Sequence, residues 1–210
     1  MGRLNITAVR RQQIIDATLR VLARKGWNET SIDEISKEAD VSRGLVSYHF
    51  GDKAALLAGV LDRCEQIFRR GGSMARDAAT DTVERQRLSI RNGILAVRDY
   101  PLTYEVVQQF VLGGRSDPEL AERVREFYRN SRALVAQRIR DGQAEGVFRR
   151  EIDPDAAAAR HMAITMGVAQ QWLLEPGSFD IEEVGRQCEE MLMSYLTGRA
   201  SGREAVAATA

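Results

Sequence analysis

The segment 30–53, TSIDEISKEADVSRGLVSYHFGDK, carries two helix-start signals separated by one short apolar stripe. Ser31 and Glu34 can form a capping box, in which each side chain bonds the backbone N–H of the other residue. Ser42 offers a second N-cap. Between the two caps, apolar residues recur at helical spacing: Ile32, Ile35 and Ala39. Two short helices around a tight turn are typical of a helix-turn-helix, whose second helix enters the DNA major groove.

The second of these helices would turn apolar residues inward and polar or small residues outward. The inward positions fit Val41, Leu45 or Val46, and Phe50. The residues expected outward or at the rim are Arg43, Gly44, Ser47, Tyr48 and His49. Arginine can donate two hydrogen bonds to guanine, and serine can pair with several base edges. The absent side chain of Gly44 would let DNA approach the backbone, while Tyr48 and His49 could bond phosphates and set the register.

Residues flanking this helix complete the candidate DNA contacts. Asp52 is expected to cap the next helix, so Lys53 would lie in a first turn whose N–H groups favour a phosphate. The hydroxyls at the helix starts are included as well: Thr30, Ser31 and Ser42. Arg3 and Arg10 belong, with Arg11, to a basic N-terminal cluster that could reach a flanking phosphate or the minor groove. The same caps and stripe also occur in helical hairpins that bind no DNA, and a basic terminus can simply be solvated.

Composition indicates a folded chain of one large or two small domains. The 210 residues are 44% hydrophobic and include only four prolines, which suits a mostly helical protein with a real core. No apolar run approaches ~18 residues, and the N-terminus lacks the apolar core of a secretory signal. Cys64 and Cys188 both sit in apolar helical patterns, so buried free thiols and a cytoplasmic location are expected.

The overall net charge is zero, which is unusual for a DNA-binding protein. Residues 1–53 hold nine basic and seven acidic side chains, a net charge of +2. Each subunit would therefore neutralise few phosphates, and the affinity is expected to depend on dimerisation.

The rest of the chain also reads as helices. Starts are marked by Asp117-Pro118, Asp153-Pro154 and Asp180, because Asp caps a helix and Pro suits its first turn. Gly71-Gly72-Ser73 is expected to end or kink the fourth helix. The expected apolar stripe of the last helix is Val184, Cys188, Met191, Leu192 and Tyr195, and a longer stripe near residues 120–139 includes Leu134. The tail 199–210 is small and polar, and we expect it to be disordered.

Residues 8–57 resemble the N-terminal domain of the TetR family of transcriptional regulators. The matching segments are RRQQIIDATLRVLARKGWNETSIDEIS and VSRGLVSYHFGDKAALL. Two positions depart from the family pattern: Asp40 stands where the family usually has Gly, and Ser47 where it often has Tyr. The resemblance implies an all-α fold of about nine helices. Its N-terminal helix-turn-helix domain would span residues 1–53, and a larger helical-bundle domain for ligand binding and dimerisation would span 54–198.

The segment 101–184 resembles the C-terminal domain of the BetI-like subgroup. The residues behind this are Ser116-Asp117-Pro118-Glu119-Leu120, Asp141-Gly142-x-x-x-Gly146 and Gly167-x-x-x-x-Trp172-Leu173-Leu174-x-Pro176. In the family, the last two helices of each subunit form a four-helix dimer interface. Here those helices would be 156–174 and 181–196, and the resemblance implies a homodimeric repressor that binds double-stranded operator DNA.

Helices between Thr82 and Trp172 could line a cavity for an unidentified small-molecule effector, since apolar walls with few polar groups suit such a site. The candidate lining residues are Tyr104, Gln108, Phe110, Phe127, His161, Met162, Thr165, Met166, Gln170 and Trp172. At helical spacing the same residues could equally be ordinary core. Ligand would favour a conformer in which the recognition helices no longer match the operator.

An enzyme and a protein-binding adaptor are the alternatives. The sequence has no metal-spaced His/Cys cluster, no nucleophile elbow and no phosphate loop, so we predict neither catalytic activity nor a metal, a cofactor or a membrane partner. An adaptor would use the second domain to bind a protein instead of a small molecule.

Overall fold

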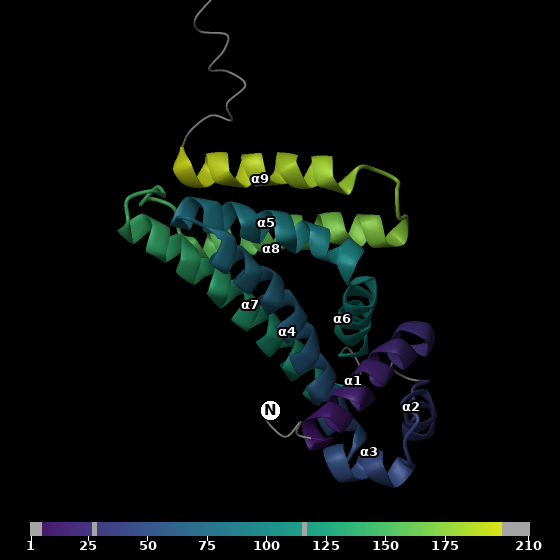
Figure 1. Cartoon of the computed structure of the whole chain (residues 1–210). Helices are drawn as coiled ribbons and strands as arrows, with labels where there is room; N and C mark the ends of the chain where they lie inside the picture. Colours follow the sequence, from purple (N-terminus) through teal and green to yellow (C-terminus); the bar gives the residue numbers. More distant parts are fainter. Residues whose placement is uncertain (1–5, 27–28, 115–116, 199–210) are drawn as a thin grey trace, which may run out of the picture. The chain divides into compact units, whose positions relative to one another are not determined.

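The computed structural model describes residues 6–26, 29–114 and 117–198, and it describes residues 70–78 by their backbone alone. Over these ranges the chain forms nine α-helices and no strand (Figure 1). The all-α prediction is therefore confirmed. None of the helices in these ranges is long and apolar enough to cross a membrane.

The helices group into two compact units. The first takes its residues from Met1–Ile67 and Pro101–Phe127, and the second from Phe68–Tyr100 and Tyr128–Ala210. Two long helices, α4 (Lys53–Ala78) and α7 (Pro118–Ala144), contribute residues to both units. The functional boundary at residue 53 remains a prediction.

In the first unit, α1 (Ile6–Lys25) packs against α2 (Ile32–Glu38) and α6 (Pro101–Gly113), while α2 contacts α3 (Arg43–Phe50). The apolar stripe of α1 forms much of this core, and its buried members are Ile14, Ile15, Ala17, Leu19, Val21 and Leu22. The other helices of this unit also contribute buried residues: Ile35, Val46, Phe50 and Phe110. The helix-turn-helix therefore rests on α1, because α1 covers the apolar face of α2.

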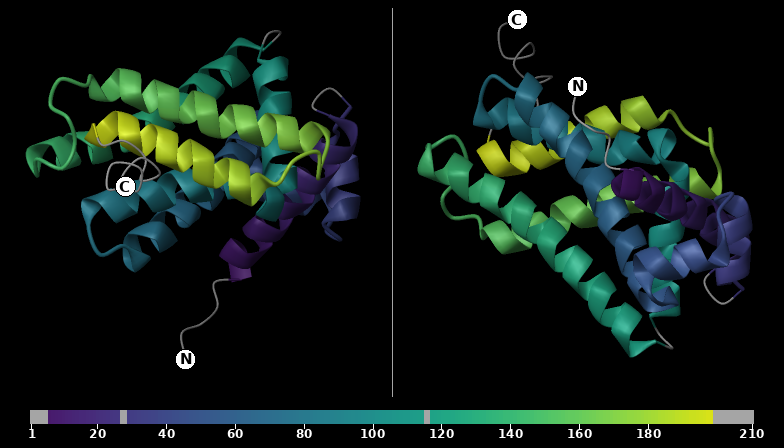
Figure 2. Two further views of the ribbon diagram at one scale, coloured as in Figure 1. Left: turned by 90° about the horizontal axis from the view of Figure 1, so that it is seen from above. Right: turned by 60° about the horizontal axis from the view of Figure 1, so that its bottom comes forward.

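In the second unit, α5 (Thr82–Asp99) contacts both α8 (Pro154–Leu174) and α9 (Ile181–Thr197), and α8 and α9 lie side by side (Figures 1 and 2). Ile90, Ile94 and Val97 of α5 are fully buried. Gly185 of α9 faces α5, since a Cβ there would lie 3.5 Å from Cγ2 of Ile94, an ordinary van der Waals contact.

The predicted aspartate caps are present. Asp52 accepts a hydrogen bond from the N–H of Ala55 at 2.7 Å, and Asp117 accepts from Leu120 at 3.1 Å. Asp153 and Asp180 cap α8 and α9 in the same way. The glycines at 71 and 72 do not end α4, which continues to Ala78.

The apolar stripe of α9 was predicted on the wrong face. On α9 the buried residues are Ile181, Gly185, Glu189, Leu192, Met193 and Leu196, so the predicted stripe lies beside the core face: only Leu192 is buried, and Met191 is 54% exposed. Cys188 is half-buried instead of buried. On α7 the predicted stripe is buried at Leu120, Phe127 and Ile139, but Leu134 is exposed and its neighbours Val135 and Ala136 are buried instead.

Candidate nucleic-acid interface

The capping box at the start of α2 is formed as predicted. Ser31 Oγ accepts a hydrogen bond from the N–H of Glu34 at 3.3 Å, and the N–H of Ser31 donates to Glu34 Oε2 at 3.3 Å. Lys25 forms an ion pair with Glu34. The hydrogen bond from Lys25 is the main reason that the pKa of Glu34 lies below its usual value. The end of α1 and the start of α2 are thus tied together by charge as well as by packing.

The turn between α2 and α3 depends on one left-handed residue. Asp40 has a φ of 50°, and among the described residues it is the only non-glycine with a positive φ. The N–H of Val41 then donates to the carbonyl of Ser36 at 3.0 Å. Ser42 begins α3, because its side chain accepts from the N–H of Leu45 at 3.2 Å. This turn sets the angle at which the second helix leaves the first.

The outer face of α3 is made of the residues that the sequence assigned to it. Ser42, Arg43, Gly44, Ser47 and Tyr48 are exposed, and Tyr48 reaches 79% exposure. His49 is half-buried, and its ring lies 5.2 Å from that of Tyr48 in an edge-on arrangement. Val46 and Phe50 face the core as expected.

The end of α3 is held by an arginine that the sequence groups with the basic terminus. Arg11 of α1 stacks its guanidinium 4.2 Å from the centroid of the Phe50 ring. Its Nη1 donates to the backbone carbonyl of His49 at 3.1 Å. Nearby, Gln13 donates to the carbonyl of Ala39 at 2.6 Å. Side chains of α1 therefore bond the last carbonyls of both α2 and α3, where a helix leaves acceptors unsatisfied. No local sequence signal identifies these contacts.

Several basic residues of the first unit are neutralised by neighbouring acids. Glu38 of α2 receives Arg20 at 2.7 Å and Arg24 at 2.6 Å, and these two hydrogen bonds lower its pKa. Arg43, at the start of α3, lies 3.1 Å from Asp33. Much of the positive charge of this unit is therefore compensated by acidic side chains of the same unit.

The other residues predicted to contact DNA differ in how far they are exposed. Arg10 is exposed and donates to Gln13 at 2.8 Å. Lys53 is half-buried, and burial lowers its pKa. Thr30 is buried, and its hydroxyl donates to the carbonyl of Gly26 at 2.7 Å, so its side chain belongs to the interior and is not presented to a ligand. Arg3 lies outside the described residues.

Comparison with known protein families agrees with this helix-turn-helix geometry. Residues 14–60 match the profile of bacterial regulatory proteins of the tetR family, and residues 96–197 match that of the C-terminal domain of BetI-type transcriptional repressors. Together the two matches cover most of the chain. This protein belongs to the TetR family of transcriptional regulators.

Individual relatives are distant. The transcriptional regulator BetI of Pseudomonas fluorescens is 33% identical over 90 residues, which are 43% of this chain and 46% of that protein. The match therefore spans less than half the length of this curated relative. A solved TetR-family regulator from Rhodococcus sp. has a TM-score of 0.79 at 20% identity, covering 89% of this chain and 98% of that one. A regulator from Saccharomonospora viridis, solved in complex with choline, has a TM-score of 0.76 at 22% identity, covering 91% and 100%. At these identities the structures show a shared fold.

The structure divides the ten candidate effector residues of this TetR-family protein between the two units. Tyr104, Phe110 and Phe127 are buried in the first unit, where Gln108 is half-buried. The other six belong to α8 in the second unit: His161 and Thr165 are buried, and Met162, Met166, Gln170 and Trp172 are half-buried. Their assignment to an effector site remains a prediction.

His161 lies in a buried polar cluster that sequence reasoning did not anticipate. Its Nδ1 is 3.4 Å from Nε2 of Gln86, and Arg138 donates to Gln86 Oε1 at 3.3 Å and to Ser89 at 2.7 Å. Burial, followed by the charge of Arg138, lowers the pKa of His161 to about 3. The imidazole is therefore neutral at physiological pH and serves as a hydrogen-bonding group.

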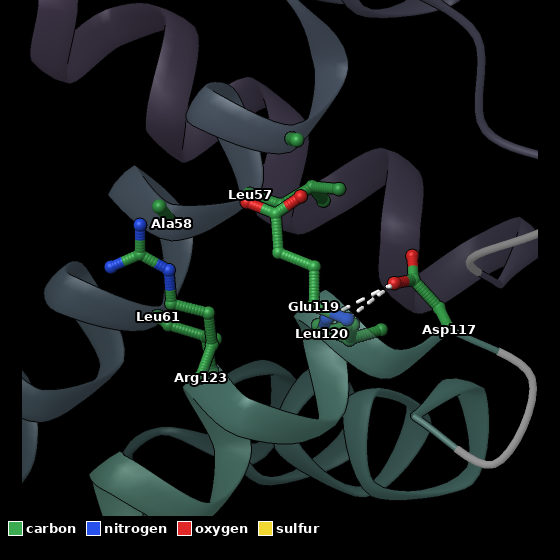
Figure 3. Close-up of a pocket in the computed structure, with 8 residues that line it drawn as sticks. Leu57, Ala58, Leu61, Asp117, Glu119, Leu120 and Arg123 are labelled. Atoms are coloured by element: carbon green, nitrogen blue, oxygen red, sulfur yellow. Dashed lines mark hydrogen bonds between the residues drawn. The ribbon is translucent and has the colours of Figure 1, made fainter.

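A small pocket lies between α4 and α7 within the first unit (Figure 3). Its volume is about 30 Å³, and its lining residues are Ala54, Leu57, Ala58, Leu61, Asp117, Glu119, Leu120 and Arg123. None of the ten candidate effector residues lines it. Ligand sites usually enclose roughly 300–1,000 Å³, so this pocket has room for water and not for an effector. No group of three His, Cys, Asp or Glu side chains in the described part of the chain is arranged to hold a metal ion.

Proposed function

We propose that this TetR-family protein is a sequence-specific DNA-binding regulator, most simply a homodimeric repressor that a small molecule releases from its operator. The observation that carries the proposal is the outer face of α3, where Arg43, Ser47 and Tyr48 are exposed beside the cap of the helix. These side chains suit the major groove, because they can bond base edges and phosphates. The family matches support the same reading.

Gly44 supports close contact between α3 and DNA. A Cβ at this position would have no neighbour nearer than Ser42 Oγ at 3.9 Å, and its φ is not positive. Nothing in the protein's own packing therefore requires a glycine there, although glycine costs a helix roughly 1 kcal/mol relative to alanine. A duplex lying against the backbone would supply the reason.

The outer face of α8 and α9 supports dimerisation through these helices. Ala159 and Ala163 are exposed small residues one turn apart on α8. Gly167 lies one turn further on, and a Cβ at that position would have no other atom within 4 Å. On α9, Met191 is exposed and the nearby Cys188 is half-buried. Small residues allow helices to approach closely, and apolar residues favour burial. A two-fold dimer would place the two recognition helices about 34–36 Å apart, one turn of DNA.

The fold is the basis for proposing a small-molecule effector, since a regulator of the same fold has been solved with choline bound. The ten candidate residues are the starting set for finding its site. An effector can shift the protein toward a DNA-free conformer only by its difference in affinity for the two conformers.

The test is an electrophoretic mobility shift with the DNA upstream of the protein's own gene and an unrelated duplex as competitor. We expect a specific complex at low salt. Arg43→Ala should weaken discrimination between operator variants, whereas Lys53→Ala should weaken binding to all duplexes about equally. A wild-type protein that binds both duplexes alike, or neither, would contradict the proposal.

A further inference from the structure

The first residue of α3 is tied to α2 by a surface ion pair. Arg43 Nη1 lies 3.1 Å from Asp33 Oδ1 and 3.3 Å from Asp33 Oδ2. Both side chains are largely exposed, 69% for Arg43 and 59% for Asp33. The pair therefore lies on the surface that would face DNA if the proposed function holds, and the inference below rests on that function.

Stability does not explain this pair well. Exposed ion pairs contribute little to folding, because water screens them and two flexible side chains must be ordered. Asp33 does lie in the first turn of α2, where a negative charge is favourable, but that effect needs no arginine partner. A carboxylate beside a DNA-binding surface also repels phosphates, so its presence calls for a compensating role.

The geometry of the pair leaves one edge of the guanidinium open. Both carboxylate oxygens approach Nη1, and within the described ranges no residue forms a hydrogen bond with Nε or Nη2 of Arg43. Two adjacent N–H groups of arginine match the N7 and O6 acceptors of guanine. A carboxylate that holds Nη1 restricts the rotation of a long side chain before DNA arrives, so less freedom is lost on binding.

We infer that Asp33 is a positioning residue for base recognition, which orients the Arg43 guanidinium toward a guanine in the major groove. It acts on specificity in a second way. When Arg43 finds its guanine, the arginine stays beside Asp33 and balances its charge. On a duplex without that guanine, the held guanidinium gains no base contact while the carboxylate still lies near the phosphates, so wrong sites are penalised.

The experiment uses the full-length protein and a duplex selected by the wild type from a random pool. Each guanine of that duplex is then replaced in turn, and dissociation constants are measured for wild type, Asp33→Asn, Arg43→Ala and the double variant. Asp33→Asn keeps the side-chain shape and removes the charge. We expect it to lose roughly tenfold of the discrimination at one guanine position, within the range of a bidentate contact, and to bind an unrelated duplex a few-fold more tightly.

Two comparisons separate positioning from a general charge effect. Asp62→Asn removes the same charge from an exposed position on α4, and it should tighten binding to all duplexes by a common factor. In the Arg43→Ala background, Asp33→Asn should change the discrimination by less than about twofold, because the oriented group is already absent. Thermal unfolding of Asp33→Asn confirms that the variant is folded.

The inference is overturned if Asp33→Asn discriminates as well as wild type, or if it only shifts all duplexes by the factor seen for Asp62→Asn. Either result leaves the proposed function intact, because wild type still selects a sequence. A wild type that selects no sequence from the pool would instead overturn the proposed function, and the role of Asp33 with it.

Discussion

Asp40 carries the left-handed turn of the helix-turn-helix. The left-handed region is costly for residues with a Cβ, but Asp tolerates it better than most because its short polar side chain can bond locally. Asp40 stands where the TetR pattern usually has glycine. It keeps the turn, with a φ of 50° in the left-handed region, as expected for Asp.

We predict that Asp40→Val lowers the free energy of unfolding by roughly 1–2 kcal/mol, because a β-branched residue is strained at positive φ. Asp40→Gly is the matched control and should be at least as stable as wild type. Urea unfolding measures both. Equal stability of the valine variant would show that the turn can relax to negative φ.

His161 links folding to pH. It titrates near 6.5 in the unfolded chain, whereas burial keeps it neutral in the folded protein down to a pKa of about 3. Below pH 6.5 the unfolded state therefore binds a proton that the folded state does not. The stability of the folded state therefore carries no penalty from His161 above pH 6.5, and it declines as the pH falls toward 3.

The expected result is a fall in the free energy of unfolding of up to about 1.4 kcal/mol per pH unit below pH 6.5. His161→Gln, which cannot titrate, should remove this part of the slope. Urea titrations of both proteins at several pH values between about 6.5 and 5 make the measurement. Parallel profiles for the two proteins would refute the assignment to His161.

At the scale of elements, helix positions follow from the sequence better than helix faces do. The buried face of α9 includes Gly185 and Glu189, and neither is apolar. Glu189 is acceptable there because Arg87 and Arg91 of α5 lie 2.9 and 2.6 Å from its two oxygens. A prediction from hydrophobic periodicity assigns such residues to the exposed face. It therefore placed the buried face of α9 on the neighbouring stripe around Met191.

The end of α7 depends on one close approach. A Cβ on Gly142 would lie 2.1 Å from Cδ2 of Phe148, which is 3% exposed. The N–H of Phe148 also donates to the carbonyl of Gly142 at 3.1 Å. The loop after α7 therefore folds back across the helix at a residue whose missing side chain makes room for the ring.

Gly142→Ala should lower the free energy of unfolding by about 1–3 kcal/mol, as overpacked cores do. In a Phe148→Ala background, where the ring is absent, the same substitution should cost almost nothing. Chemical denaturation of the four proteins gives the coupling energy. An equal cost in both backgrounds would mean that the ring is not the obstacle.

At the scale of the whole molecule, the net charge of zero predicts that DNA binding depends on the proposed dimer. A single subunit whose arginines are already paired with acids would neutralise few phosphates, and we expect it to bind DNA weakly. Two linked recognition helices convert the second contact into an intramolecular one.

Ala163→Arg on the outer face of α8 is therefore expected to give a folded monomer whose operator affinity is lower by roughly a hundredfold or more. The control is Ala133→Arg, which adds the same side chain at an exposed position of α7. Analytical ultracentrifugation gives the oligomeric state, and fluorescence anisotropy with labelled operator gives the affinity. A dimeric Ala163→Arg variant would place the interface elsewhere.

The sequence by itself determined where the helices begin, the helix-turn-helix and the family, because caps, turns and periodicity act between residues a few positions apart. It also identified the exposed residues of α3. Only the tertiary structure decided that Thr30 is interior, that Arg11 holds the end of α3 and that Asp33 meets Arg43. Whether a polar side chain is satisfied inside or left for a ligand depends on partners from other helices, and packing alone brings those partners within reach.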